Sequence, residues 1–332
     1  MLNYHYFYAI MLEKEKTFLK DWMLPIAMTA GAAIYLILHF VPPFSEDAYM
    51  AVSRKLQPVL ISIMLFLQLN VVAPSDLKFH KWHFELIAVQ AVLFAAFAFI
   101  ATGLPDGGGR ILTECAMLCF ICPTAAAAGV ITSKIGGSLP GIMTYTVLAD
   151  LLASLLIPLM IPLVHPTVEV GFFSYFFAII RRVFSILVLP CLLAWFIRYF
   201  FPGLQRWLAR YAGWAFYVWG LGLVLAISLA TGALVTSGIG FAVVLGIAAV
   251  SLVCCLLQFW MGRRVARHYG RVESITAGQA LGQKNTGFII WLGFNYMTPV
   301  TSVAGGLYAI WHNLVNSFEL YQTRKVSGLS KE

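Results

Sequence analysis

The sequence predicts an all-α protein that passes through a membrane many times. Of its 332 residues, 61% are hydrophobic and only 11% are charged, whereas a soluble domain has about 25% charged residues. The apolar residues also form long runs, and a helix needs about 20 of them to cross a bilayer. This composition excludes a water-soluble globule, a disordered chain and a nucleic-acid-binding protein, despite the formal net charge of +8.

Ten apolar stretches predict ten transmembrane helices in two halves of five. The first half comprises residues 23–42, 56–73, 84–104, 111–132 and 139–164. The second half comprises residues 183–201, 212–234, 238–262, 274–297 and 299–322. With five spans in each half, the second half enters the membrane from the opposite side, so we expect two inverted repeats.

Basic residues predict the orientation of the chain. They gather in alternate loops, most clearly at Arg263, Arg264, Arg267 and Arg271, and by the positive-inside rule these loops are cytoplasmic. We therefore expect a multi-pass protein of the plasma (cell inner) membrane with both termini in the cytoplasm. Residues 1–22 mix aromatic with charged side chains and predict an interfacial segment, as a short helix or a disordered tail; residues 323–332 form a cytoplasmic tail.

All six cysteines fall inside predicted spans, which argues against a disulfide framework. Cys115, Cys119 and Cys122 recur at the spacing of one helix face. Thiolates on one face can bind a soft metal or a metalloid. Cysteine is also a small apolar residue that is commonly buried, so both interpretations stay open.

The fourth and ninth spans are interrupted. Span four contains Pro123 followed by small residues, and span nine contains the polar, glycine-rich stretch from Gly278 to Gly287. Proline and glycine weaken helices, and freed backbone groups are tolerated at membrane depth only where protein or a water-filled cavity satisfies them. A matching pair of interrupted spans in the two halves predicts the binding site of a transporter.

Three ionisable residues lie at membrane depth, where charge is costly and marks a functional site by default. Asp150 and Lys284 have opposite charges and similar depth, which suggests a buried ion pair. A purely structural pair, or a neutral Asp150 with local hydrogen bonds, remains open. Glu114 lies near the outer end of span four, closer to the membrane surface than the other two residues. His312 and Asn313 on span ten either line the cavity or support the broken span nine.

Several motifs resemble the bile acid:sodium symporter family. Cys122-Pro123 followed by small residues resembles the family's span-four motif, and Gly282 to Gly287 resembles its span-nine motif. The run from Ala304 to Asn313 is similar to the family's Pro-Gly-Ala-Leu-Tyr-Ser-Val-Trp-His-Asn. Val72 to Leu77 resembles the end of the family's second span, Leu-Ser-Pro-Glu-Asp-Phe.

The resemblance implies an organic-anion carrier that works by alternating access, with a panel domain, a core domain and broken helices that cross in the core. The panel would comprise residues 23–82 and 166–236, and the core residues 83–165 and 237–322.

The residues that bind sodium in the family are mostly missing here. Ala128 and Gly129 replace the family's Ser-Asn pair, and Ala280 replaces a glutamate of span nine, for which a one-residue shift offers only Gln279. Lys284 replaces a glutamine beside Gln283, and its charge repels a cation; only Thr146, on span five, retains a matching hydroxyl. We therefore expect Lys284 to stand in for sodium. With Asp150 it would support proton-linked or uncoupled transport.

Half-helix N-termini at the two breaks favour an anion. The predicted substrate-binding residues are Thr124, Asn285, Thr286, His312 and Asn313. An amphipathic carboxylate or sulfonate, bile-acid-like or otherwise, fits these donors and the apolar walls of the panel.

Other functions stay in view. Three alternatives remain open: a sodium-coupled symporter, a metalloid or oxyanion efflux carrier that uses a span-four cysteine, and a sensor that binds ligand without transport. An intramembrane enzyme needs a nucleophile and a base facing one cavity, and no motif supplies that pair, so we expect no catalytic activity. The expected partners are the organic anion and the lipid bilayer; the oligomeric state is open.

Overall fold

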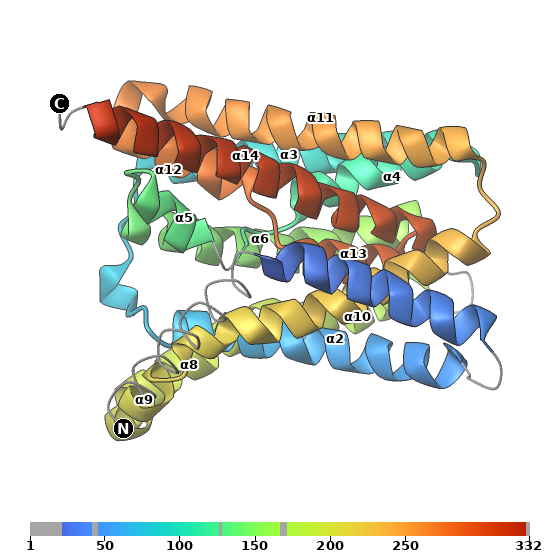
Figure 1. Ribbon diagram of the computed structural model, residues 1–332, viewed down its shortest axis with the longest axis horizontal. Helices are drawn as coiled ribbons and strands as arrows, with labels where there is room; N and C mark the ends of the chain where they lie inside the picture. Colours follow the sequence, from blue (N-terminus) through green and yellow to red (C-terminus); the bar gives the residue numbers. More distant parts are fainter. Residues whose placement is uncertain (1–21, 42–45, 126–127, 167–170, 330–332) are drawn as a thin grey trace, which may run out of the picture.

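The computed structural model describes residues 22–41, 46–125, 128–166 and 171–329, and this part of the chain is built from helices. The predicted interfacial segment therefore lies outside the described residues, apart from Trp22. The longer helices run roughly side by side along one axis of the molecule (Figure 1). They are Trp22–Phe40, α2 (Glu46–Leu69), α3 (Lys81–Thr102), α6 (Leu139–Val164), α10 (Ala215–Thr236), α11 (Phe241–Ala266) and α14 (Val303–Leu329).

Within the described residues, six helices are long and apolar enough to cross a membrane. A bent pair, α7 (Phe172–Leu187) and α8 (Leu189–Phe200), raises the number to seven if it forms one span. The chain thus has the helices of a membrane protein. Each of the ten predicted stretches overlaps a helix or a pair of helices, and ten crossings stay a prediction.

The interruptions predicted for spans four and nine are present. α4 (Gly108–Ile121) ends just before Pro123, and α5 (Ala128–Lys134) follows. α12 (Arg271–Gly282) ends at a glycine, and α13 (Thr286–Tyr296) begins four residues later. Because proline has no N–H and glycine is a weak helix former, the chain is unwound at both places.

The stretch predicted at 183–201 is wrong in its bounds. The structure has helix from Phe172 to Phe200 with a bend of 45° between α7 and α8. Pro190 occupies the first turn of α8 and cannot donate a backbone hydrogen bond to the preceding turn. Arg181 and Arg182 interrupt the apolar run of α7. The uncharged stretch in the sequence therefore begins only at residue 183.

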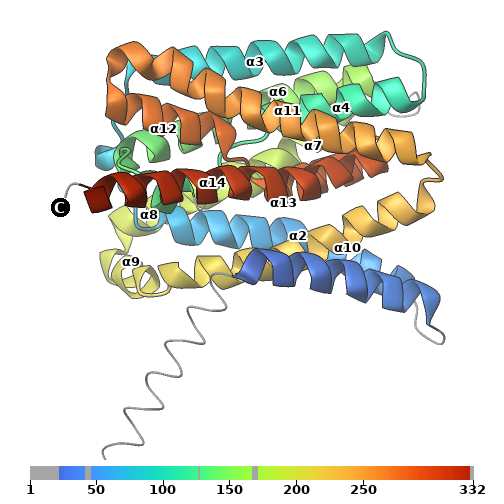
Figure 2. The same ribbon diagram turned by 45° about the horizontal axis from the view of Figure 1, so that its top comes forward.

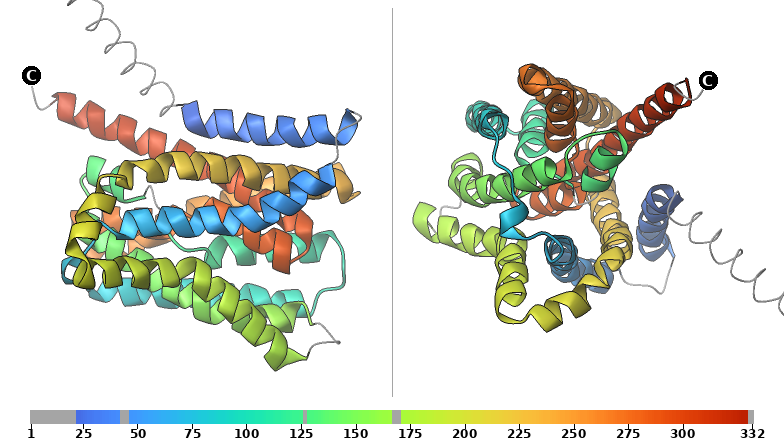
Figure 3. Two further views of the ribbon diagram at one scale, coloured as in Figure 1. Left: turned by 90° about the horizontal axis from the view of Figure 1, so that it is seen from below. Right: turned by 90° about the vertical axis from the view of Figure 1, so that its left-hand side faces the viewer.

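The helices pack mainly as two groups. α2 lies along α10 and α8, while α11 lies along α12, α4 and α14, and α3 lies along α4 and α6. Figure 2 shows α2, α8, α9 (Pro202–Ala209) and α10 on one side and α3, α4, α11 and α12 on the other. The end-on view shows Trp22–Phe40 at the edge of the bundle (Figure 3). The panel and core domains as bounded above stay a prediction, since α6 also packs against α7.

Close packing of α11 on α12 depends on Gly262. A Cβ built there would lie 2.2 Å from the Ala277 carbonyl oxygen and 2.9 Å from the Gly278 Cα. Both are backbone atoms, so a side chain at this position forces the two helices apart.

We expect Gly262→Ala to destabilise the fold by about 1–3 kcal/mol, as overpacking of a tight interface does. Gly109→Ala is the matched control, because a Cβ at that helical glycine meets nothing within 4 Å. Thermal unfolding in detergent can be followed with a thiol-reactive dye, since all six cysteines are buried. Equal transition temperatures for the two variants would contradict the close contact.

Candidate functional site

The two unwound segments cross in the interior of the bundle. They form an antiparallel bridge between Thr124 and Lys284. The Ala125 N–H donates to the Gln283 carbonyl at 3.0 Å, and the Asn285 N–H donates to the Pro123 carbonyl at 2.9 Å. Each segment thus satisfies backbone groups that the other left free when its helix stopped.

Side chains reinforce this crossing. The Thr124 hydroxyl donates to the Ala280 carbonyl at 2.8 Å, and the Cys122 thiol donates to the Asn285 carbonyl at 3.1 Å. The Asn285 side chain accepts a hydrogen bond from the Phe288 N–H at 3.2 Å and so caps α13. The predicted residues Thr124, Lys284, Asn285 and Thr286 therefore lie together, and Thr124 and Asn285 have structural roles there.

Lys284 is buried in the crossing, with 1% of its surface exposed. Its ammonium Nζ donates to the Phe120 carbonyl at 3.2 Å. Phe120 lies in the last turn of α4, where carbonyls without helical partners carry partial negative charge. The ammonium thus occupies a position whose electrostatics suit a cation.

The suggested ion pair between Asp150 and Lys284 is wrong. No ion pair between described side chains joins them. Asp150 is 3% exposed, and neither of its carboxyl oxygens has a hydrogen-bond partner. Its carboxyl lies within electrostatic range of the thiols of Cys122 and Cys191. Similar depth along the two spans thus did not bring the two charged groups into contact.

A small cleft of about 20 Å³ lies beside the crossing, between α2, α10 and the start of α13. Asn285 and Gly287 form its polar side, and the Asn285 Nδ2 amide group is buried without a hydrogen-bond partner. The remaining lining is Leu60, Ile61 and Met64 of α2 with Val218, Trp219, Gly222 and Leu223 of α10. The cleft thus has a hydrogen-bond donor at one side and apolar side chains at the others.

Several predicted site residues lie outside this cleft. The Thr146 hydroxyl donates to the Ile142 carbonyl of its own helix at 2.9 Å, and the Asn313 amide does the same to Ala309 at 2.7 Å. The His312 ring lies edge-on to Tyr308, and its Nδ1 has no hydrogen-bond partner.

Gln279 and Gln283 belong to a second polar cluster. Gln283 Nε2 donates to Gln279 Oε1, and Gln279 Nε2 donates to Glu319 Oε2 at 2.6 Å. Arg263 forms an ion pair with the same Glu319. This cluster ties α12 to α11 and α14, so the two glutamines are engaged with Glu319 in this structure.

Sequence reasoning missed two buried glutamines that support the crossing and the cleft. Gln90 of α3 donates to the Ile121 carbonyl at 2.9 Å and accepts a hydrogen bond from the Tyr145 hydroxyl. Gln57 of α2 donates to the Gly287 carbonyl at 2.9 Å. The available signal was a lone amide side chain inside an apolar span, which is costly unless it is hydrogen-bonded.

The cysteines of α4 are buried and free. Among the described residues, no group of three or more histidine, cysteine, aspartate or glutamate side chains is arranged to hold a metal ion. Cys115 and Cys119 are thus packed in the interior of the bundle.

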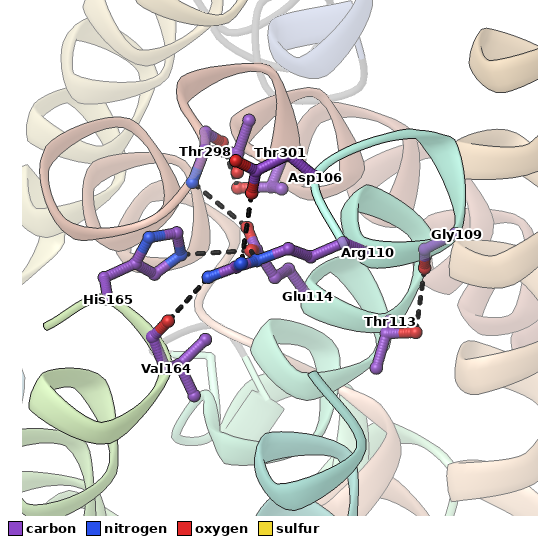
Figure 4. Close-up of polar contacts among 9 residues, drawn as sticks. All are labelled: Asp106, Gly109, Arg110, Thr113, Glu114, Val164, His165, Thr298 and Thr301. Carbon is purple, nitrogen blue, oxygen red and sulfur yellow. Dashed lines mark hydrogen bonds and ion pairs between the residues drawn. The ribbon is translucent and has the colours of Figure 1, made fainter. Parts of the chain in front are cut away.

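Glu114 is the centre of a polar cluster at the far end of α4 (Figure 4). It accepts from Arg110 at 3.1 Å and from the Thr298 N–H at 3.0 Å, and His165 lies 3.0 Å from the same carboxyl. Arg110 also donates to the Val164 carbonyl at 2.6 Å. Glu114 therefore joins α4 to the end of α6 and to the connection between α13 and α14, a structural role that explains its burial.

No family model matches this chain, and no curated protein matches it. The resemblance to the bile acid:sodium symporter family therefore rests on the motifs alone.

We expect Glu114→Gln to lower the stability of the fold by about 3 kcal/mol, because it removes one partner of a buried ion pair. Asp106→Asn is the control. Asp106 pairs with the same Arg110 at 3.0 Å but is 97% exposed, and such a pair contributes at most about 1 kcal/mol. Thermal unfolding of both variants measures the difference; similar transition temperatures would show that the Glu114 cluster does not tie these helices together.

Proposed function

We propose that the chain is a secondary transporter of organic anions that works by alternating access, and that Lys284 takes the place of a coupling sodium ion. The crossing of two interrupted helices at Thr124 and Lys284 carries this proposal. Interrupted helices expose backbone dipoles inside the protein, and transporters use such ends to bind charged substrates and ions. Ten crossings of the membrane, as two inverted repeats of five, are part of the proposal.

The antiparallel direction of the bridge supports inverted repeats. Segments from corresponding positions of the two halves meet in opposite directions, as they do when one half enters the membrane from the other side. The packing of α2 with α10 and of α4 with α11 supports a panel and a core that are each built from both halves.

The cleft supports an organic anion as substrate. Its polar side is the beginning of α13, where helix N–H groups and the unpartnered Asn285 amide are hydrogen-bond donors. Its other walls are apolar. At about 20 Å³ it is far smaller than ordinary ligand pockets, which begin at about 300 Å³. A bile-acid-like body therefore requires the panel to move away from the core.

Lys284 supports transport without sodium. Its ammonium already donates to the Phe120 carbonyl at the end of α4, and a second cation in this place would be repelled. Asp150, buried without a partner, is then the carboxyl available to bind a proton. Proton-linked and uncoupled transport both follow from this arrangement.

We expect counterflow of labelled taurocholate in proteoliposomes to proceed equally with sodium and with sodium fully replaced. Counterflow needs no driving gradient, so it tests the substrate class and the need for sodium together. Lys284→Gln should abolish exchange or change its pH dependence, because it removes the cation at the crossing. Lys134→Gln, at an exposed lysine of α5, is the control and should leave exchange unchanged.

The other outcomes separate the parts of this proposal. Exchange only with sodium would contradict the role of Lys284 as a substitute for the ion. Exchange of organic cations in preference to anions would contradict the substrate class. An absence of exchange for a panel of bile acids and smaller organic acids would contradict the transport function itself.

A further inference from the structure

α2 is closed onto α13 at the end where α2 begins, which we call the Glu46 end. Gln57 donates to the Gly287 carbonyl at 2.9 Å, and the Arg54 guanidinium lies 4.7 Å above the ring of Phe294. Apolar packing continues this closure, because Phe294 packs against the cluster of Tyr35, Met50 and Leu229. Hydrogen-bond, cation–π and apolar contacts thus hold the predicted panel against the predicted core on one side.

The cleft lies immediately on the other side of Gln57. Leu60, Ile61 and Met64, which line it, follow Gln57 at three, four and seven residues and so share its face of α2. The cleft residues of α10, from Val218 to Leu223, belong to the first half of that helix. Gln57 therefore stands at the boundary between the closed Glu46 end and the cleft.

The groups at this boundary have unused hydrogen-bonding capacity. Asn285 Nδ2 is a buried donor without a partner, whereas the unpartnered Gln57 Oε1 is an acceptor and cannot bind an anion. The Gln57 amide donates to Gly287, two residues from Asn285. An anion held at the start of α13 would therefore offer acceptor oxygens to two amide groups, one from each predicted domain.

We propose that Gln57 is the gating residue of this carrier, and that the acidic head group of the substrate competes with Gly287 for its amide. This inference rests on the proposed function, because the ligand is the anion transported. When the head group accepts from Gln57, the bond that closes the Glu46 end is broken. A ligand shifts an equilibrium by its differential affinity for the two states, and the exchanged hydrogen bond supplies that difference.

Accessibility of a cysteine at the closed end tests the gate without any substrate. Ser53 is fully buried one turn before Gln57, and Ser53→Cys introduces a reporter of nearly the same size. A membrane-impermeant maleimide is applied to proteoliposomes from each side in turn, and the chain without the reporter measures labelling of the native cysteines.

We expect Gln57→Leu to raise labelling of the reporter about fivefold, from the side that faces the Glu46 end. The loss of one ordinary hydrogen bond changes the equilibrium constant between the closed and open states by about this factor. Gln205→Leu is the matched control. The Gln205 amide also donates to a carbonyl at 2.9 Å, that of Asn70, but both residues belong to the predicted panel. Arg54→Met removes the other closing contact at a more exposed position and should also raise labelling.

Taurocholate is then added to the reporter chain with Gln57 intact. Labelling should rise, whereas in the Gln57→Leu background taurocholate should have no further effect. Unchanged labelling in both Gln57→Leu and Arg54→Met, with cooperative unfolding retained, would overturn the gate. An equal increase in Gln205→Leu would overturn it too. Labelling is measured independently of counterflow. If Gln57→Leu raises labelling but the protein exchanges no anions, the transport function is wrong and the closing contact of Gln57 is confirmed.

Discussion

The requirement that every backbone polar group at membrane depth be satisfied governs this structure. Two helices stop inside the bundle, and no water is available in a bilayer core to take up their free N–H and C=O groups. The crossing answers this requirement with two reciprocal backbone hydrogen bonds, from Ala125 to Gln283 and from Asn285 to Pro123. Neither interrupted helix satisfies the break alone, so the two halves of the chain depend on each other at one point.

The electrostatics of the crossing follow from the same breaks. The last turn of α4 presents carbonyls with partial negative charge, and Lys284 lies against one of them, that of Phe120. The first turn of α13 presents N–H groups, and the cleft lies against it. One crossing thus places a site suited to a cation beside one suited to an anion, and a covalently attached ammonium fills the first. In the proposed carrier, this ammonium takes the place of a bound ion.

The breaks could be predicted from the sequence, and the contacts between helices could not. Pro123 and the glycines from Gly278 to Gly287 are local signals, so both interruptions were found. The pairing of Asp150 with Lys284 was wrong because sequence indicates depth along a span but not the direction in which a helix faces. The Glu114 cluster was missed because His165 and the Thr298 N–H come from distant segments; only the Arg110–Glu114 spacing was local.

The closing contacts lie at the Glu46 end, so the two ends of the structure differ. Phe294 and the first turn of α13 are in contact with α2, whereas the cleft lies on the other side of Gln57. If the basic loops are cytoplasmic, α2 begins at the outer surface, and the cleft then belongs to the cytoplasmic half of the protein. These closing contacts comprise a hydrogen bond, a cation–π contact and the apolar packing of Phe294, and all of them must separate if the proposed carrier is to open at this end.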